Sequence, residues 1–414
     1  MVLSRFDRKL RDILFVVGSL FALASVTAQA PLHYEPTIES LSRHPLPQWY
    51  ADAKLGIFVH WGLYSVQIQK WRSEDWAKVF HDAGAKYVVL TTKHHDGFTL
   101  WPSSTPNPSL PADRQHASRD LVSELTAAVN QQGLRMGLYY SGGYDWTFVP
   151  GPIRVAADYQ KVKPQSEAYG KYVDAQFREI IARYKPAVLW NDIDYPKSGH
   201  PLQIMAEYYQ AVPDGVIDDR FGVKHSDFIS PEYQTLEKIN PKKWEECRGL
   251  GRSFGYNRAE GEAETIAPDE LIYLLADIVS KNGNLLLDVG PEADGTIPIV
   301  QMERLKALGA WLQVNGEAVY ATHPWKRAAG ETAEGIPVRF TQKETATYAI
   351  LLGQPKALTA TFKSLSVKPG TKIYLLGDAD PLAWSQQGDN LRVDLPAALN
   401  GHYAYSFRIA GPVS

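Results

Sequence analysis

The sequence predicts an α/β fold: a (β/α)8 TIM-like barrel followed by a small C-terminal β-sandwich. Three observations predict it. Short apolar strands alternate with amphipathic helices from Leu55 to about Gly316, polar and aromatic residues follow successive strands, and helical spacing disappears after about Thr322. Alternation of this kind is typical of a parallel sheet, and its end indicates a second region built from antiparallel strands.

Apolar runs bounded by turn residues mark the expected barrel strands. In chain order these runs are Leu55–Val59, Tyr87–Leu90, Met136–Tyr139, Ala187–Trp190, Val216–Ile217 and Asn284–Leu287. Each run is short and almost wholly apolar, as expected of strands that helices cover on the outside and side chains fill on the inside.

Apolar residues recur at helical spacing between these strands. Leu121–Val129 carries them at i, i+1, i+4, i+7 and i+8, and Gly133 follows to end the helix. Leu271–Val279 is preceded by Pro268, a residue favoured in the first helical turn, and a last helix is expected from Ile299 to Gln313.

The residues that follow the strands favour a barrel over a doubly wound sheet. They are His60-Trp61, Lys93–Asp96, Tyr139-Tyr140, Asn191-Asp192, Asp218–Arg220 and Asp288. A TIM barrel builds its active site from such strand C-termini. A doubly wound sheet would place a glycine-rich phosphate turn after its first strand, and Gly62 alone does not form one.

The chain is expected to divide into residues 1–30, 31–322 and 323–414. The first segment has basic residues, an apolar run at Ile13–Ala24 and the small-x-small pattern Ala28-Gln29-Ala30, as a cleavable signal peptide does. Its apolar run is shorter than the ~20 residues of a membrane-spanning helix, which favours export to the periplasm or the medium over anchoring. In the last segment, Val338–Thr341, Thr347–Leu352 and Leu391–Leu395 read as strands of the sandwich.

Composition narrows the function. The formal net charge of -3 provides no basic surface for nucleic acid. The single cysteine, Cys247, excludes a disulfide scaffold and a cysteine-based zinc site. The 11 Trp, 22 Tyr and 14 Phe suit the stacking of sugar rings, although aromatic residues also build cores.

Two carboxyl groups would be needed to cleave a glycosidic bond, one ionised near the anomeric carbon and one protonated near the leaving oxygen. Asp192 is the candidate nucleophile because it comes just after a buried strand, although an aspartate there also commonly caps a helix. Glu232 is the candidate acid, since its apolar and aromatic neighbours would favour a protonated carboxyl. Glu237, Glu245 and Glu246 compete with it on position alone.

The pair His94-His95 raises the question of a metal. Adjacent residues beyond a strand are expected to point in different directions, and the sequence has no HExxH pair. A zinc site would need a third ligand such as His60 or Asp192. Hydrogen bonding of sugar hydroxyls by neutral imidazoles is therefore the preferred interpretation, with no metal.

The sequence resembles the α-L-fucosidases of glycoside hydrolase family 29 over nearly all of residues 45–325. The strings that carry the resemblance occur in the order of that family: Lys54–Ser65, Gly84–Phe98, Arg119–Val122, Gly137–Ser141, Leu189–Asp192, Ser253–Tyr256, Gly283–Leu287 and Asn315–Ala318. A single string of this kind would be weak evidence, but all of them in one order are specific.

The resemblance implies a retaining, exo-acting hydrolase of terminal α-L-fucosides in glycans or small fucosides, with no metal or organic cofactor. It implies that Asp192 is the nucleophile and Glu232 the acid/base. The positions implied to hold fucose are His60, His94, His95, Tyr139, Trp190 and Arg220. The histidines would bond hydroxyls, Tyr139 and Trp190 would shape the wall near the 6-methyl group, and Arg220 would orient a carboxylate.

One departure from the family affects the site. Family members have a long segment after the first strand with a Glu-Trp pair that touches fucose, whereas here Gln67–Arg72 leads straight to a helix at Ser73. Trp71 could replace the aromatic residue, but no acidic residue replaces the glutamate. The alternatives are a fucose-binding protein with impaired turnover, a hydrolase of a related sugar such as an α-L-galactoside, and a metal-dependent hydrolase.

Overall fold

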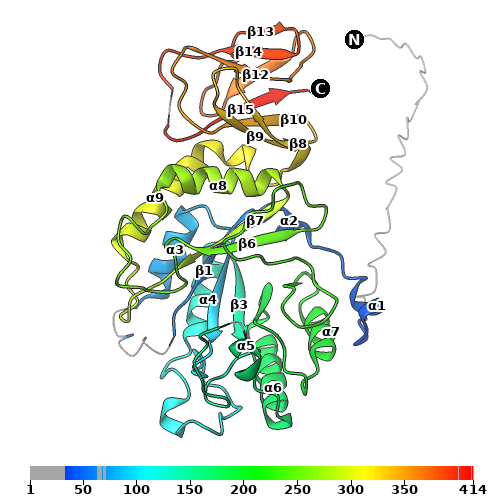
Figure 1. Cartoon of the computed structure of the whole chain (residues 1–414), viewed down its shortest axis with the longest axis vertical. Coiled ribbons are helices and arrows are strands. Elements are labelled where there is room, and N and C mark those ends of the chain that lie inside the picture. Colours follow the sequence, from blue (N-terminus) through cyan, green and yellow to red (C-terminus); the bar gives the residue numbers. More distant parts are fainter. Residues whose placement is uncertain are drawn as a thin grey trace, which may run out of the picture. The chain divides into compact units, whose positions relative to one another are not determined.

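The computed structural model describes residues 33–62, 68, 71–155, 157–399, 401–411 and 413 (Figure 1). The signal peptide predicted for residues 1–30 lies outside these residues, and so do residues 63–67, 69 and 70 of the short loop after the first strand. No helix in the described part has the length and apolar character needed to cross a lipid bilayer.

Seven parallel strands form the central sheet. They are β1 (Leu55–Val59), β2 (Tyr87–Lys93), β3 (Arg135–Ser141), β4 (Val188–Asp192), β5 (Val216–Ile217), β6 (Trp244–Gly249) and β7 (Gly283–Val289). Their order in space is β5-β4-β3-β2-β1-β7-β6, so the first and last strands of the series are neighbours, as in a barrel. The predicted strands are confirmed, whereas β6 was not predicted.

Residues 227–233 close the gap between β5 and β6 and take the place of an eighth strand. The amide of Asp227 donates to the carbonyl of Ile217 in β5 at 2.9 Å, and the amide of Cys247 in β6 donates to the carbonyl of Pro231 at 3.1 Å. Pro231 has no amide hydrogen, so this segment cannot form a regular ladder. The ring is therefore closed by one irregular member, and Glu232 lies on it.

Helices cover the outside of the barrel (Figure 1). The longer ones are α3 (Ser73–Asp82), α4 (Leu121–Gln131), α6 (Glu167–Tyr184), α7 (Pro201–Ala211), α8 (Pro268–Ser280) and α9 (Ile299–Asn315). The short ones are α1 (Ile38–Leu41), α2 (Gln48–Ala53), α5 (Asp158–Lys161) and two 3-10 turns at Ala112–Arg114 and Gly316–Ala318. Two of the longer helices have a side-chain N-cap. Asp120 accepts from the amide of Ser123 at the start of α4, and Ser166 accepts from the amide of Tyr169 at the start of α6.

Large aromatic side chains fill the inside of the barrel. Tyr50, Phe58, Tyr87, Tyr139 and Trp190 are all buried there. β1 has a glycine at position 56, where an added Cβ would lie 2.4 Å from the ring of Tyr87. A glycine is therefore required for Tyr87 to fit beneath the site.

Antiparallel strands follow from residue 323. They are β8 (His323–Glu331), β9 (Pro337–Lys343), β10 (Ala346–Leu351), β11 (Thr359–Phe362), β12 (Lys372–Leu375), β13 (Trp384–Gln387), β14 (Asn390–Asp394) and β15 (Tyr405–Ala410). They form a five-stranded sheet, β12-β15-β10-β9-β8, and a three-stranded sheet, β11-β14-β13, which share a core of their own. The predicted barrel and β-sandwich are confirmed.

Polar contacts join the sandwich to the helices of the barrel. The indole nitrogen of Trp311 in α9 donates to the carbonyl of Ala404 at 2.9 Å, and Arg339 in β9 forms an ion pair with Asp277 in α8. Residues 33–414 thus form one unit. The division into 31–322 and 323–414 stays a prediction.

Candidate active site

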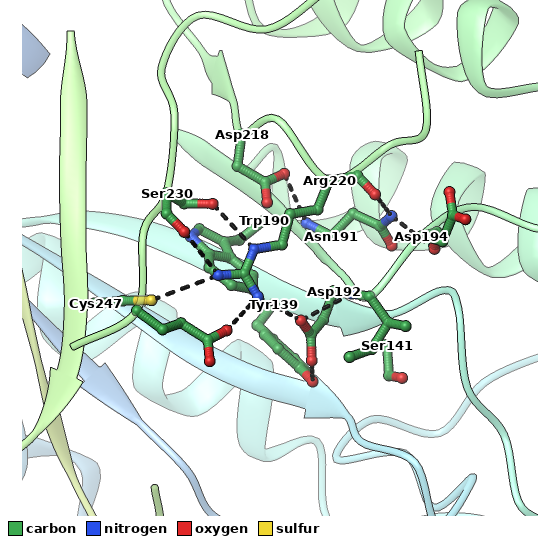
Figure 2. A network of polar contacts seen from close by, with 12 residues as sticks. Tyr139, Ser141, Trp190, Asn191, Asp192, Asp194, Asp218, Arg220, Ser230 and Cys247 are labelled. Atoms are coloured by element: carbon green, nitrogen blue, oxygen red, sulfur yellow. Dashed lines mark hydrogen bonds and ion pairs between the residues drawn. The ribbon is translucent and has the colours of Figure 1, made fainter. Parts of the chain in front are cut away.

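Asp192 is the last residue of β4, and three donors hold its carboxylate. The hydroxyl of Tyr139 donates to Oδ2 at 2.6 Å, and Nη1 of Arg220 donates to Oδ1 at 2.8 Å (Figure 2). The amide of Ile193 also donates to Oδ1, at 2.8 Å. The side chain is 11% exposed. The predicted nucleophile is thus a fixed carboxylate with one edge open.

Arg220 joins the two predicted catalytic carboxyl groups. Its Nη1 donates to Asp192 and also to Oε1 of Glu232. Its Nε and Nη2 donate to the hydroxyl and the carbonyl of Ser230 at 3.0 and 2.8 Å, and its Cζ lies 4.4 Å from the centre of the Trp190 ring. A guanidinium held along its edges and on one face cannot rotate, so Arg220 sets the position of both carboxyl groups.

The separation of the two carboxyl groups fits a retaining hydrolase. An oxygen of Asp192 and an oxygen of Glu232 both lie within hydrogen-bond distance of one nitrogen, so these oxygens are at most about 6 Å apart. Retaining glycosidases place their carboxyl groups ~5–5.5 Å apart and inverting ones ~6.5–9.5 Å apart. Asp192 and Glu232 therefore lie close together, as predicted.

The residue after each carboxyl has a left-handed backbone. Ile193 has φ 71° and Tyr233 has φ 48°. Bulky and β-branched residues rarely adopt this conformation, which costs about 1–3 kcal/mol and concentrates at functional sites. At Ile193 it turns the amide back onto the carboxylate of Asp192. Strain beside both carboxyl groups supports their functional assignment.

Four stacked aromatic rings form the floor of the site. The ring centres are 5.5 Å apart for Trp190 and Tyr139, 5.8 Å for Tyr139 and His94, and 3.9 Å for His94 and His95. Trp190 and Tyr139 are each 1% exposed. Tyr139 donates to Asp192 and Trp190 packs against Arg220, so both rings support these two side chains from below. That they also shape the wall near the 6-methyl group stays a prediction.

His95 is held as one neutral tautomer. Its Nδ1 lies 2.7 Å from the hydroxyl of Ser141, and that hydroxyl donates its own proton to the carbonyl of Tyr144 at 2.9 Å. Nδ1 must therefore carry the hydrogen, which leaves the lone pair of Nε2 free to accept. Burial lowers the pKa of His95 to about 4, against the opposing charge of Asp192. Burial also lowers the pKa of His94.

The expectation that His94 and His95 point in different directions is wrong. Residues 94–97 turn back after β2 instead of continuing the strand, and the amide of Gly97 donates to the carbonyl of His94 at 3.2 Å. One ligand atom from each histidine and one from Asp192 lie within 4.8 Å of one another, so their geometry could hold a metal. Asp192 is already neutralised by Arg220, however, which favours hydrogen bonding of a neutral ligand over a cation.

His60 is oriented by Asp288, the residue near the end of β7. Nδ1 of His60 lies 2.6 Å from Oδ1 of Asp288, and the amide of Gly255 donates to Oδ2 at 2.9 Å. Burial raises the pKa of Asp288, although the ring of His60 opposes that shift. One carboxylate thus fixes the imidazole and anchors the loop that carries Phe254.

We expect Asp288→Asn to lower kcat/KM by about 10- to 100-fold, because an amide can accept from only one of these two donors and leaves the other unpaired. Asp174→Asn is the matched control, since Asp174 holds the ring of His200 and the amide of residue 200 in the same way. Kinetics and thermal unfolding of both variants check this. Equal losses of kcat/KM in the two variants would show that Asp288 acts through stability alone.

Two of the three competing glutamates, Glu245 and Glu246, lie away from the site. Glu245 is fully buried inside the barrel, where the hydroxyls of Tyr50 and Tyr87 and the indole of Trp190 donate to it. Burial raises its pKa to about 7, because desolvation outweighs these three donors. Glu246 points outward to the hydroxyl of Thr235. Neither can reach a bond broken at the rim.

Family models match both parts of the chain. The model described as "Alpha-L-fucosidase" matches residues 21–74 and 67–317, and the model described as "Alpha-L-fucosidase C-terminal domain" matches residues 333–410. The chain belongs to the α-L-fucosidase family. It is accordingly a glycosidase.

Relatives in this family match over almost their full length. An alpha-L-fucosidase of Branchiostoma floridae is 34% identical, with 95% of this chain and 100% of the relative covered. The human tissue alpha-L-fucosidase is 32% identical, with 93% of each chain covered. The crystal structure of the Thermotoga maritima alpha-fucosidase in complex with fucose has a TM-score of 0.85 and 36% identity, covering 91% of this chain and 100% of that one.

The match to the fucosidase family comes in two stretches that overlap at residues 67–74, where the sequence predicts a shortened connection after the first strand. The sequence suggested that Trp71 could replace the missing aromatic residue, but the structure does not place it there. Its side chain is buried between Trp61 and Trp76, with ring centres 5.3 Å away from each. That side of the site therefore gains nothing from Trp71.

Phe254 belongs to the site but was not singled out from the sequence. Its ring lies 5.2 Å from that of His60 and 5.3 Å from that of Tyr233, and it is only partly buried. The signal that could have found it is its place in Ser253–Tyr256, one of the fucosidase strings.

Proposed function

We propose that the chain hydrolyses terminal α-L-fucosides, acting at the end of a glycan and retaining the anomeric configuration through a covalent glycosyl–Asp192 intermediate. One observation carries the proposal: Asp192 and Glu232 accept hydrogen bonds from the same nitrogen of Arg220. The family supplies the substrate, since its members are named for α-L-fucosides. The proposal requires no cofactor.

The reaction has two steps. In the first, Asp192 forms a bond to the anomeric carbon while the bond to the leaving oxygen breaks, and Glu232 gives that oxygen its proton. In the second, a water molecule attacks the same carbon, gives its proton to Glu232 and displaces the carboxylate of Asp192. Two inversions leave α-L-fucose.

Oδ2 is the attacking oxygen of Asp192. A carboxylate oxygen has two lone pairs, and both of those on Oδ1 are engaged by Arg220 and Ile193. Among the residues that the structure describes, only Tyr139 donates to Oδ2, so one lone pair remains for the anomeric carbon.

Arg220 also serves both steps. Its Nη1 donates to Asp192 and to Glu232, so it holds the nucleophile and the acid/base in one arrangement before the first step. Once Asp192 becomes an ester, its charge is lost and the guanidinium pairs with Glu232 alone.

Fucose is proposed to be held between the histidines and Phe254. The free Nε2 of His95 accepts a hydrogen bond from a sugar hydroxyl, and His60 and His94 face the same space, with ring centres 5.8 Å apart. Phe254, the more open aromatic ring, provides the apolar contact for the 6-methyl group.

The test of this function is the anomer of the product. A 4-nitrophenyl α-L-fucoside is hydrolysed in deuterated water, and the first anomer released is followed by proton NMR. We expect α-L-fucose before mutarotation. Release of the β anomer would contradict the proposed mechanism. Faster hydrolysis of the matching α-L-galactoside would show that fucosides are not the preferred substrates.

We expect the affinity for fucose to stay constant from pH 7.5 to about pH 5 and to fall as the pH approaches 4. The folded pKa of His95 is lowered to about 4, so the neutral acceptor form persists below the usual histidine pKa and is lost only on further acidification. Calorimetric titration of fucose, with circular dichroism at each pH to confirm folding, measures this. A loss of affinity centred near pH 6.5 would contradict it.

A fucose-binding protein with impaired turnover is the second candidate, favoured by the division of the family match at residues 67–74. A site without the Glu-Trp pair that the resemblance implies would keep more water, which would weaken its electrostatic contacts. Binding of fucose without release of nitrophenol would support this candidate.

The cluster of His94, His95 and Asp192 is the observation that favours a metal-dependent hydrolase. We propose that the reaction needs no metal, since Arg220 already neutralises Asp192. Dialysis against EDTA should leave kcat/KM unchanged.

We also propose that the chain is exported and that residues 1–30 are removed as a signal peptide. The proposal rests on the sequence of that segment, with its basic start and apolar run. Amino-terminal sequencing of the protein recovered outside the cytoplasm would test it.

A further inference from the structure

Exposed aromatic side chains gather at one end of the barrel. Among the described residues, four aromatic side chains are more than one-third exposed: Trp146, Tyr159, Tyr233 and Tyr256. Trp146 and Tyr159 lie between β3 and α6, Tyr233 ends the segment that takes the place of the eighth strand, and Tyr256 follows β6. These positions are on the rim that carries Asp192 and Glu232. Exposed aromatic rings around a glycosidase site are well suited to stack on sugars beyond the one that is cleaved.

Tyr233 is the one of these residues that lies beside the departing group. It follows Glu232, which protonates the leaving oxygen in the proposed function and must be within hydrogen-bond reach of it. In that function, the first sugar of the leaving group would lie next to Tyr233. Trp146 instead lies beside His95, in the connection that follows β3, with ring centres 5.5 Å apart.

The ring of Tyr233 is held in place. Its hydroxyl accepts from the amide of Gly249 at 3.0 Å and lies 3.4 Å from the carbonyl of Gly251. One neighbour is Phe254, and the guanidinium of Arg248 lies 5.2 Å from the centre of the ring. A fixed aromatic ring loses little entropy when it binds a sugar.

Beyond Tyr233 is a cavity of about 430 Å³, within the size range of small-ligand sites. Its charged lining consists of two positive residues, Arg248 and Arg252, and two negative residues, Glu264 and Glu270. Two positive and two negative groups provide donors and acceptors without a net charge. This lining suits a neutral ligand with many hydroxyl groups and disfavours an acidic one.

We propose that this cavity binds the aglycone, and that the substrate is a neutral fucosylated oligosaccharide rather than a small fucoside. The inference rests on the proposed function and extends it, because it assigns the leaving sugars to Tyr233 and the cavity behind it. The guanidinium of Arg248 donates to hydroxyl groups there. Its present contacts are long, 3.9 Å to Glu246 and 3.4 Å to the carbonyl of Gly249, so it can exchange them for a ligand.

Two variants test the proposal by different means. Arg248→Met keeps the length of the side chain and removes its donors, and Ala263→Phe fills the cavity from its lining. Arg135→Met is the matched control: Arg135 lies over the ring of Trp49 at 4.6 Å and pairs with Asp214, but it begins β3, at the opposite end of the barrel.

The measurement compares kcat/KM for 4-nitrophenyl α-L-fucoside with that for trisaccharides in which fucose is α-linked to position 2, 3 or 6 of a neutral disaccharide. For the trisaccharide that the unaltered chain cleaves fastest, we expect each variant to lower kcat/KM at least 10-fold, mainly through KM. For the aryl fucoside, we expect a change below 2-fold. Arg135→Met should leave the ratio between the two substrates unchanged.

Equal effects on both substrates, or no effect on either, would overturn the aglycone site. Ala263→Phe keeps the test decisive if Arg248→Met does not fold. An unaltered chain that releases no fucose from any of these substrates would instead overturn the proposed function, and the inference with it.

Discussion

Asp192→Gly should lower the hydrolysis of an aryl α-L-fucoside by on the order of 10⁴-fold or more, the scale of losing a residue that forms the covalent intermediate. Azide should restore part of the turnover and yield β-L-fucosyl azide, because the small anion can enter the space of the lost carboxylate and invert the configuration once. Steady-state kinetics with and without azide, and NMR of the product, check both results.

Asp194→Asn is the control for this variant. Asp194 is two residues further along the same loop and pairs with Lys163 rather than with Arg220. Asp194→Asn should change kcat/KM only slightly. If Asp192→Gly kept most of its activity, or if azide gave an α-linked product, the nucleophile would have to be another group.

The strand ends of the barrel could be predicted because their signal is local. The run Ala187–Trp190, which precedes Asn191 and Asp192, is wholly apolar, and a buried parallel strand is the simplest structure that it can form. Since the C-termini of parallel strands meet on one rim, the grouping of His60, His94 and Asp192 follows from their positions alone.

The surroundings of Glu232 could not be predicted in this way. Its segment contains Pro231 and has no period-2 pattern, so nothing marks it as the member that closes the ring. The apolar setting expected for Glu232 is wrong: the carboxyl is 45% exposed and pairs with Arg220. β6 was missed because its sequence, WEECRG, is rich in charge, and only the buried tyrosines show why Glu245 is tolerated.

Supporting contacts are also beyond local patterns. Asp288 lies 228 residues from His60, and Ser141 lies 46 residues from His95. The orientation of each imidazole depends on these pairs, so a sequence can suggest that a histidine binds a hydroxyl without indicating which nitrogen is free. Trp71 shows that a suitable position in the sequence is not enough to predict a site residue. Its side chain packs against Trp61 instead of entering the site.

Glu232→Ala should affect substrates according to their leaving groups. A sugar alcohol leaves poorly without a proton, so kcat/KM for a fucosylated oligosaccharide should fall about 10²–10⁴-fold, the range for loss of a general acid. A 2,4-dinitrophenolate leaves without one, so formation of the intermediate from its fucoside should be nearly unchanged. For a series of aryl fucosides, the logarithm of the rate can be plotted against the pKa of the leaving phenol. The slope of this plot should be steeper for the variant than for the unaltered chain. Glu237→Ala, which removes the exposed carboxyl that competes with Glu232 on sequence position alone, is the control. A loss independent of the leaving group would assign Glu232 to binding instead.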